Sequence, residues 1–381
     1  MNSLRDIVES SPQLRGIETK ANLQGEETPQ PLGPALWDWC GVRKILIVRL
    51  RSIGDTVLAT ACLAALKRFV PNAEIDVLVE DWVAPVLDEH PHVTNVITIE
   101  HDSLKSRARA ARAIRAARYD VVYNLHGGTT ATFLTRATGA RHRVGYATYQ
   151  YSHLHNHQAP SPLVLWEKQK THSAEQQLAL LGWTGVPVSD RPATTLAISD
   201  AAIEAVNQRL LSNGIQEQPV ALIHPAAAFA TKQWAPENFA RVVEFLAEAG
   251  LVSVAIAASH ETAVLKQLAS NSSARVVTLD LSLPEVTALA SRSQLFVGND
   301  SGIAHMANAV GTPAVVIFGS SNIAHWRPWN NAAAEVVFEE MACQPCHGYF
   351  CEKFEQPECI LRVPVSRVTA AIERILQTSP S

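Results

Sequence analysis

The sequence predicts an α/β fold of two doubly wound domains, each built on a parallel sheet. Short aliphatic runs alternate with helix-length segments, which is typical of parallel sheets whose crossover helices cover both faces. This alternation occurs twice, on either side of a stretch rich in proline, serine and threonine at residues 186–195. The length of 381 residues is about two and a half times a typical domain of roughly 150 residues. Two packed domains therefore account for the chain.

The first series of predicted elements begins near residue 42, after a segment of different character. Residues 1–40 contain scattered charges and several prolines but no sustained hydrophobic period, which predicts a flexible N-terminal arm. Aliphatic runs then predict strands at residues 44–49, 75–79, 93–99 and 119–125, with a helix at 56–69 after the first of them. The first domain is expected to cover residues 41–185.

The second series repeats this architecture. Strands are expected at residues 220–223, 251–257, 275–279, 294–297 and 314–318, and helices at 236–249, 262–270, 284–291 and 303–310. The second domain is expected to cover residues 186–362, and residues 363–381 to form a C-terminal helix and tail. Two such domains would face each other across a cleft at the carboxyl ends of their strands, where ligands of open α/β sheets bind.

The composition excludes several classes of protein. Hydrophobic residues make up 47% and charged residues 18%, which excludes an intrinsically disordered chain. Lysine and arginine number 32 against 36 aspartate and glutamate, so no global basic field for nucleic acid exists. The longest apolar runs fall far short of the roughly 18 residues of a membrane span, and the start of the chain lacks an export signal. A cytoplasmic protein is expected, one that could sit against a membrane.

The loop after the first predicted strand carries a candidate base. R-S-I-G-D at residues 51–55 opens a helix, with Gly54 allowing a ligand to approach the backbone and Asp55 in the first helical turn. Asp55 could simply cap the helix, since aspartate is favoured there. It could also act as a general base in the cleft. No G-x-G-x-x-G motif follows the strand, so a nicotinamide dinucleotide site is not predicted.

The second domain contains a candidate site for a diphosphate. G-N-D-S-G-I-A-H at residues 298–305 runs from a strand through a turn into a helix, and Asp300 or Ser301 can cap that helix. The free N–H groups from Gly302 onward attract an anion, and His305 could donate to a phosphate oxygen. Asp300 would repel phosphate, so we expect it to face a sugar hydroxyl or to fix the turn. Lys232, before the helix at 236–249, could bring an ammonium group to the diphosphate.

Two clusters near these segments allow other interpretations. Cys343, Cys346, Cys351 and Cys359 could form a four-thiolate zinc site, although the second pair is spaced more widely than in a standard zinc ribbon. His153, His155 and His157 alternate, as on one face of a strand, and a polar loop on the acceptor side is favoured over a metal site.

Aromatic and basic residues add two further hypotheses. Trp326 and Trp329 could stack on a nucleobase or sugar, but packing in a core or interface is the simpler interpretation. Residues 103–118 form a strongly basic helix, which is either a solvated surface or a site of attraction to an anionic acceptor or inner leaflet.

Four motifs together resemble a known family. They are R-S-I-G-D at residues 51–55, T-K-Q-W-A-P-E-N-F at 231–239, G-N-D-S-G-I-A-H-M-A at 298–307 and G-T-P-A-V-V-I-F-G at 311–319. In this order they resemble glycosyltransferase family 9, the bacterial lipopolysaccharide heptosyltransferases, over about residues 42–378. The resemblance implies the GT-B architecture of two facing Rossmann-like domains. It also implies inverting, metal-independent transfer of heptose from ADP-heptose to a lipid-linked core saccharide, without a cofactor.

The resemblance also implies roles for single residues. Asp55 in the acceptor-side domain would deprotonate the acceptor hydroxyl, and Glu261 in the donor domain would contact the nucleoside. The diphosphate and the sugar would be held by Lys232, Asp300, Ser301, Gly302 and His305. The acceptor would be reached at the inner face of the inner membrane, through peripheral contact.

Other functions remain open at this point. Alanines at residues 226–228 and the A-A-S at 257–259 depart from the family pattern, so a related nucleotide sugar is an alternative donor. A nucleotide-sugar epimerase would share the two-domain shape but would need acid and base groups on both sides of one sugar carbon. A catalytically degenerate sugar-nucleotide binding protein is the non-enzymatic alternative.

Overall fold

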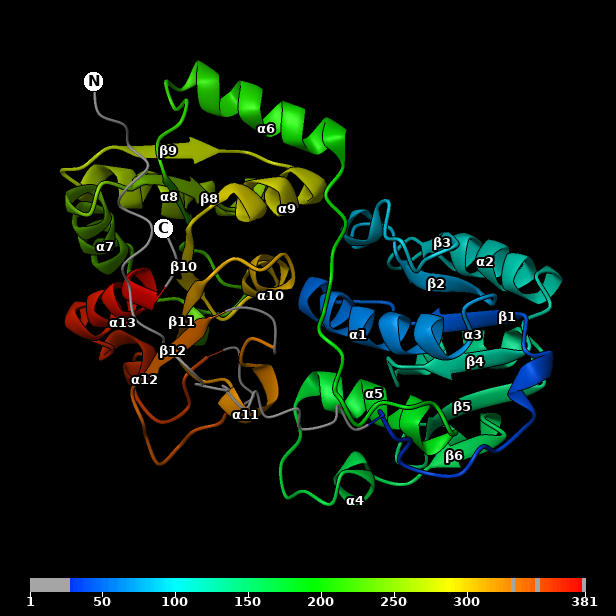
Figure 1. Ribbon diagram of the computed structural model, residues 1–381. Coiled ribbons are helices and arrows are strands. Elements are labelled where there is room, and N and C mark those ends of the chain that lie inside the picture. Colours follow the sequence, from blue (N-terminus) through cyan, green and yellow to red (C-terminus); the bar gives the residue numbers. More distant parts are fainter. Residues whose placement is uncertain (1–27, 330–332, 347–349, 379–381) are drawn as a thin grey trace, which may run out of the picture.

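The structure consists of two lobes that lie side by side (Figure 1). It is a computed structural model that describes residues 28–329, 333–346 and 350–378. Each lobe is built on a six-stranded sheet in which the paired strands are parallel. Helices cover both faces of each sheet (Figure 1). The predicted fold class, α/β with two Rossmann-like domains, is confirmed.

The first domain follows the order β3-β2-β1-β4-β5-β6 in its sheet. Its strands are β1 (Lys44–Val48), β2 (Glu74–Glu80), β3 (Asn95–Ile99), β4 (Val121–Asn124), β5 (His142–Tyr146) and β6 (His157–Ala159). Its helices are α1 (Ile53–Phe69), α2 (Leu104–Ala116), α3 (Thr129–Ala137), α4 (Pro162–Leu165) and α5 (Ser173–Trp183).

Strand β1 shows why the aliphatic runs become central strands. Ile45 and Ile47 pack on the side of the sheet covered by α1 and α5, whereas Leu46 and Val48 pack on the side covered by α2 and α3. All four side chains are fully buried. A parallel strand that is covered on both faces has no solvated side, and its sequence is therefore continuously apolar.

The second domain has the sheet order β12-β11-β10-β7-β8-β9. Its strands are β7 (Val220–His224), β8 (Val252–Ile256), β9 (Val276–Leu279), β10 (Leu295–Asn299), β11 (Ala314–Phe318) and β12 (Ala334–Phe338). Helices α6 (Asp200–Ser212), α9 (Leu283–Arg292) and α10 (Gly302–Ala309) pack on one face, and α7 (Pro236–Glu248), α8 (Thr262–Asn271) and α13 (Val365–Thr378) on the other. The short helices α11 (Ile323–Trp326) and α12 (Glu358–Leu361) lie in the later connections.

The two sheets share one topology, which defines where ligands can bind. The strand order reverses between β1 and β4 in the first sheet and between β7 and β10 in the second. At such a switch point the loops that follow the two adjacent strands diverge to opposite faces and leave a crevice. The loop with Asp55 follows β1, and the loop with Asp300 follows β10. Both candidate segments therefore lie at switch points.

Three strands are absent from the sequence prediction, and all three lie toward the end of their sheets. β5 begins with the polar residues His142 and Arg143, β6 has only three residues, and β12 is mostly half-exposed. A strand near an edge is less buried and lacks the continuous aliphatic run by which central strands are recognised.

The three neighbouring histidines do not share a strand face, and that expectation is wrong. His153 lies in a 3-10 turn at Ser152–Leu154, and only His157 belongs to β6. The turn directs the side chains apart: His155 lies 3.2 Å from Asn124 (Nε2 to Nδ2), whereas His157 lies 3.0 Å from His142 (Nε2 to Nδ1).

The described end of the predicted N-terminal arm packs against the first domain. The Leu32 N–H donates to the Gly182 carbonyl (3.0 Å), and the Trp39 indole donates to the Thr184 carbonyl (3.1 Å). Trp39 belongs to the core that α1 and α5 form on the sheet. Residues 1–27 of the predicted arm lie outside the described residues.

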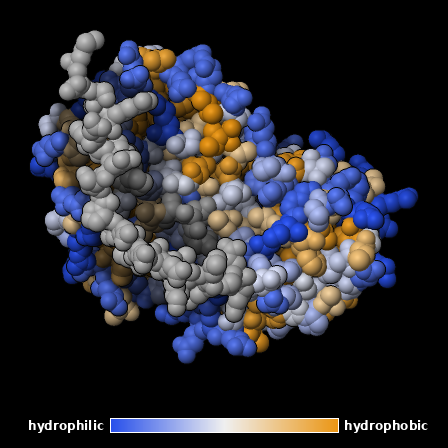
Figure 2. Space-filling view, in the orientation of Figure 1, coloured by the Kyte–Doolittle hydropathy of each residue, from blue (hydrophilic) through white to orange (hydrophobic). Residues whose placement is uncertain are grey.

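The basic helix predicted at residues 103–118 is present as α2, on the outside of the first domain. Its exposed side chains include Lys105, Arg109 and Arg112, while Ala110 and Ile114 are buried against the sheet. Hydrophilic side chains dominate this part of the surface (Figure 2). Across the described parts of the chain, no helix combines the length and the apolar character needed to span a bilayer.

Candidate active site

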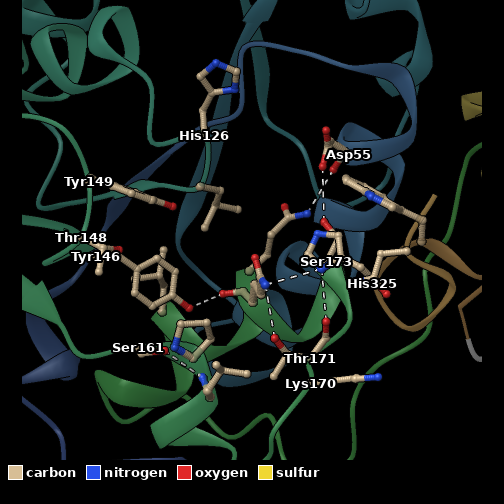
Figure 3. Close-up of a pocket in the computed structure, with 18 of the residues that line it drawn as sticks. Asp55, His126, Tyr146, Thr148, Tyr149, Ser161, Lys170, Thr171, Ser173 and His325 are labelled. Atoms are coloured by element: carbon tan, nitrogen blue, oxygen red, sulfur yellow. Dashed lines mark hydrogen bonds between the residues drawn. The ribbon is translucent and has the colours of Figure 1, made fainter. Parts of the chain in front are cut away.

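Asp55 occupies the first turn of α1, at the switch point of the first sheet. The chain leaves β1 through a short loop, Ser52 becomes the N-cap residue, and Asp55 is the third residue of the helix. Its carboxylate pairs with the Arg49 guanidinium and accepts a hydrogen bond from the Ser52 hydroxyl (3.1 Å). It also accepts one from the Ser173 hydroxyl (3.3 Å) (Figure 3). Ser173 starts α5, so two elements hold the carboxylate in place.

The environment keeps Asp55 ionised. Burial, the largest influence, raises the pKa of Asp55, but the charge and hydrogen bond of Arg49 together with the Ser52 contacts outweigh it. The net pKa therefore lies below the ordinary value of an aspartate. Only 14% of the Asp55 side chain and 11% of the Arg49 side chain are exposed, so solvent screens the pair weakly. A carboxylate in this state can accept a proton at neutral pH.

Replacing Arg49 with Gln is expected to move the acid limb of the pH profile of kcat/KM to higher pH. Without the guanidinium, the effect of burial on Asp55 dominates and its pKa rises. Since the base must be unprotonated, activity at weakly acidic pH falls first, while activity well above the new pKa is less affected. Arg49→Lys keeps a positive charge and should leave the limb nearer its original position. An acid limb that stays at the same pH in Arg49→Gln would show that the protonation state of Asp55 does not control kcat/KM.

Helix α10 presents its N-terminus at the switch point of the second sheet. Ser301 is the N-cap residue, and its hydroxyl accepts from the Ala304 N–H (3.4 Å) and lies 3.2 Å from Nδ1 of His224. Asn299 fixes the preceding turn because its amide donates to the Pro225 carbonyl (2.8 Å) and accepts from the Trp234 N–H (3.1 Å). The N–H groups of Gly302 and Ile303 precede the capped Ala304 and are left for a ligand, as an anion site requires.

Lys232 and Asp300 form an ion pair at this helix end. The Lys232 ammonium lies 2.8 Å from the Asp300 carboxylate, which also accepts from the Ser321 hydroxyl (2.5 Å). Lys232 ends a 3-10 turn at Ala230–Lys232, and 21% of its side chain is exposed, against 6% for Asp300. Asp300 therefore holds the ammonium beside the N-terminus of α10 rather than only fixing the turn.

His305 lies one turn into α10 and is buried. Burial, the largest influence, lowers the pKa of His305, although the carboxylates of Asp300 and Asp55 oppose this effect. The imidazole is therefore neutral at pH 7 and can donate one hydrogen bond. His224, at the end of β7, is also neutral because burial lowers its pKa to about 4.

All residues that the sequence analysis assigns to the site line one cavity of about 520 Å³. They are Asp55, Lys232, Glu261, Asp300, Ser301, Gly302 and His305. Glu261 precedes α8 and its carboxylate accepts from the Ala258 N–H (3.2 Å). The lining also has an apolar part that includes Ile256, Leu283 and Val286. This combination of charged and apolar lining suits a nucleotide.

Two glycines allow the domains to meet beside this cavity. A Cβ atom on Gly302 would lie 2.8 Å from Cβ of Ile53, and one on Gly54 would lie 2.9 Å from Cδ2 of His305. The first turns of α1 and α10 are therefore in direct contact across the cleft, next to each other in Figure 1. A Cβ atom at Gly302 would force the first turn of α1 to move, and one at Gly54 would displace the His305 side chain.

A second cavity, of about 570 Å³, lies on the other side of Asp55 and belongs mainly to the first domain (Figure 3). Asp55 and Trp326 line both cavities. Trp329, in contrast, packs in the core of the first domain, and its indole donates to the Pro192 carbonyl (2.9 Å).

No residue of this second cavity other than Asp55 and Trp326 is predicted from the sequence. A signal was available for Arg49 and His126, because Arg49 ends one predicted strand at the switch point and His126 directly follows the other.

The four clustered cysteines line a third cavity, of about 550 Å³, behind the turn that carries Lys232. Burial, with the three neighbouring thiols, raises the pKa of Cys359 to about 11. Among the side chains that the structure describes, no group of three or more histidine, cysteine, aspartate or glutamate residues is arranged to hold a metal ion. Residues 347–349, within this segment, are outside the described ranges. A zinc site at Cys343, Cys346, Cys351 and Cys359 thus stays a prediction.

Known proteins share this sequence pattern and this fold. The chain is 27% identical to lipopolysaccharide heptosyltransferase 3 of Escherichia coli, over 87% of this chain and 98% of that protein. A glycosyl transferase family 9 structure from Veillonella parvula superposes with a TM-score of 0.75 at 19% identity, covering 88% of this chain and 98% of that one. The E. coli ADP-heptose heptosyltransferase II superposes at 0.72 with 21% identity and the same coverage of both chains. The family model described as glycosyltransferase family 9 (heptosyltransferase) matches residues 107–355. Because this match spans well over half of the sequence, the chain belongs to glycosyltransferase family 9.

Proposed function

We propose that this protein transfers heptose from ADP-heptose to a lipopolysaccharide core saccharide, with inversion at the anomeric carbon. Membership of the heptosyltransferase family supports the donor and the acceptor class. The observation that carries the proposal is the position of Asp55, which lines both the donor-side cavity and the second cavity. A base at the boundary of two cavities can reach an acceptor hydroxyl in one and an anomeric carbon in the other.

The donor would bind with its diphosphate at the N-terminus of α10. The N–H groups of Gly302 and Ile303, the Lys232 ammonium and the neutral His305 imidazole are the available donors of hydrogen bonds to phosphate oxygens. Glu261 would accept from hydroxyls of the nucleoside, beside the apolar part of the lining. These groups would supply the stabilisation of the leaving ADP, so the reaction needs no catalytic metal.

The transfer is then a single displacement. The acceptor oxygen attacks the anomeric carbon while the bond from that carbon to the diphosphate oxygen breaks, and the acceptor proton passes to Asp55. ADP leaves with the electron pair of the broken bond, and the attack from the opposite side inverts the configuration. Asp55 is suited to this step because Arg49 lowers its pKa and keeps it unprotonated.

The acceptor would be reached at the inner face of the inner membrane. The exposed lysine and arginine side chains of α2 support this part of the proposal, since basic helices are attracted to anionic lipid surfaces.

The test is release of ADP from ADP-heptose by the purified protein, with and without a truncated lipid-linked core acceptor. Release that depends on the acceptor, together with a heptosylated product of inverted configuration, is the expected result. EDTA should leave the rate unchanged. Turnover of a different nucleotide sugar would retain the mechanism and replace the donor. Conversion of the sugar nucleotide without ADP release would indicate an epimerase, and binding without turnover would indicate a degenerate binding protein.

A further inference from the structure

Trp82 is an exposed aromatic residue in the wall of the donor-side cavity. It follows β2 in the first domain, whereas most of the lining of that cavity belongs to the second domain. Its relative exposure is 47%, and it is the only exposed one of the eight tryptophans, all of which lie in the described ranges. A single exposed aromatic side chain is common on protein surfaces. This one, however, is held within a ligand cavity.

The carboxylate of Glu80 holds the indole of Trp82 in place. The indole N–H donates to Oε2 of Glu80 (2.8 Å), and Oε1 of the same carboxylate lies 3.1 Å from Nδ1 of His101. Only 6% of the Glu80 side chain is exposed. Burial, the largest influence, raises the pKa of Glu80, but the hydrogen bonds of Trp82 and His101 and the neighbouring positive charges outweigh it. The indole therefore donates to a carboxylate ion, which is a strong hydrogen bond that fixes the ring.

The loop that carries Trp82 is anchored on the second domain. Val83 and Val86 belong to the first domain, yet both are buried in the core that α6, α9 and α10 form on the second sheet. The 3-10 turn that contains Val86 contacts α9. Helix α9 also supplies Leu283 and Val286 to the apolar part of the cavity lining. Trp82 is therefore placed next to this apolar part, across the boundary between the domains.

The parts of a nucleotide sugar differ in the groups that they can contact. The diphosphate needs cations and N–H donors, and the hydroxyls of the sugar need hydrogen-bonding partners. Such groups gather around Lys232 and Asp300 at the N-terminus of α10. The nucleobase is the part that has two flat faces on which an aromatic side chain stacks. An indole beside aliphatic side chains therefore fits the base better than any other part of the donor.

Trp326, the other tryptophan in this lining, is less suited to such a contact. It is half-buried, it packs against the cores of both domains, and it meets the His325 ring edge-on with the centroids 4.5 Å apart. It lines the second cavity as well, together with Asp55. Trp82 lines only the donor-side cavity of the two, away from the base that the transfer uses.

We propose that Trp82 stacks on the nucleobase of the bound donor, which is then enclosed between the indole of the first domain and the aliphatic side chains of the second. The inference rests on the proposed function for the class of ligand, a nucleotide sugar, and adds a residue of the first domain to its binding site. The nucleoside would thus contact both domains, and part of the affinity for the nucleotide would depend on Trp82.

The test compares ligands with and without a base, by calorimetry. Trp82→Leu keeps an apolar side chain but has no flat face, so the Kd of ADP should rise about tenfold, within the range for loss of one base–aromatic stack. Trp82→Phe keeps an aromatic ring and should recover most of the affinity. The Kd of inorganic pyrophosphate should be the same in all of these proteins. Phe133→Leu is the matched control, because Phe133 is exposed to a similar extent (51%) and lines neither cavity.

Three results would overturn the inference. An unchanged Kd of ADP in Trp82→Leu would mean that the base lies elsewhere, and an equal rise for ADP and pyrophosphate would mean that the change acts on the whole cavity. A Kd of ADP as high in Trp82→Phe as in Trp82→Leu would mean that the aromatic face has no part in binding.

These measurements need no turnover, so they are independent of heptosyl transfer. A protein that shows the expected series of Kd values but transfers no heptose would contradict the proposed function and support the stacking role of Trp82. If the wild-type protein binds UDP or GDP in place of ADP, the same series with that nucleotide is the test, since stacking tolerates any base. Binding of none of the three nucleotides would overturn the inference together with the proposed donor.

Discussion

Asp55→Asn is expected to reduce kcat for heptosyl transfer by about two to four orders of magnitude, the range for loss of a general base. Asparagine has nearly the same shape but cannot take up the acceptor proton. It retains an oxygen that accepts from Ser52 and Ser173, so the first turn of α1 should keep its geometry. The affinity for ADP should change little, because the residues that we propose to bind the diphosphate belong to the second domain.

The measurement is the rate of acceptor-dependent ADP release, with ADP affinity measured by calorimetry on the same samples. Asp200→Asn is a matched control, since Asp200 is exposed on α6 and lines neither cavity. A variant at position 55 that keeps more than about a tenth of the wild-type kcat would contradict the role of Asp55 as base, because general-base catalysis accounts for at least about a hundredfold.

Lys232→Met should lower kcat/KM for ADP-heptose by about two to three orders of magnitude, as expected when one preorganised charge at the leaving group is removed. Methionine preserves the length and apolar stem of lysine. The change also leaves the Asp300 carboxylate, 6% exposed, beside the diphosphate site without its ammonium partner. We expect a loss of about 2 kcal/mol in stability, less than for a fully buried pair because Lys232 is 21% exposed.

The double variant Lys232→Met with Asp300→Asn separates these two effects. It removes the uncompensated carboxylate, so the thermal midpoint should recover while the defect in kcat/KM persists. Lys266→Met, on the exposed side of α8, controls for loss of a lysine. If the double variant recovers turnover along with stability, Lys232 serves only to neutralise Asp300 and has no part in binding the diphosphate.

The sequence was sufficient to predict those site residues that lie directly after central strands. Asp55 and Asp300 each follow a buried aliphatic run, one in each sheet, and two facing α/β domains border one cleft with the carboxyl ends of their strands, so the convergence of these residues could be inferred without coordinates. Lys232 could be added because the family motif places it next to the edge of the second sheet. The cavity that these residues line is the outcome of that topology.

The residues of the second cavity could not all be predicted in the same way. Gln177 is on a helix whose sequence gives no sign of which side chain faces Asp55, and its hydrogen bond to the Asp55 carbonyl depends on the three-dimensional arrangement. The turn that separates His153 from His157 was missed for a related reason, since alternating histidines fit a strand and a turn equally well. Edge strands such as β12 were missed because partial exposure removes the hydrophobic run.

The contact between Gly54 and Gly302 has an electrostatic consequence for the motion of the two domains. It brings the first turns of two helices together, and each turn carries a partial positive charge of roughly half a unit from its macrodipole. Like-signed ends repel, although the ionised Asp55 carboxylate in the first turn of α1 offsets part of this repulsion. An anion bound at this junction would be attracted by both helix ends and would favour their contact. The nucleotide diphosphate would then act as a bridge that draws the lobes together, and departure of ADP would release them, which couples product release to opening of the enzyme.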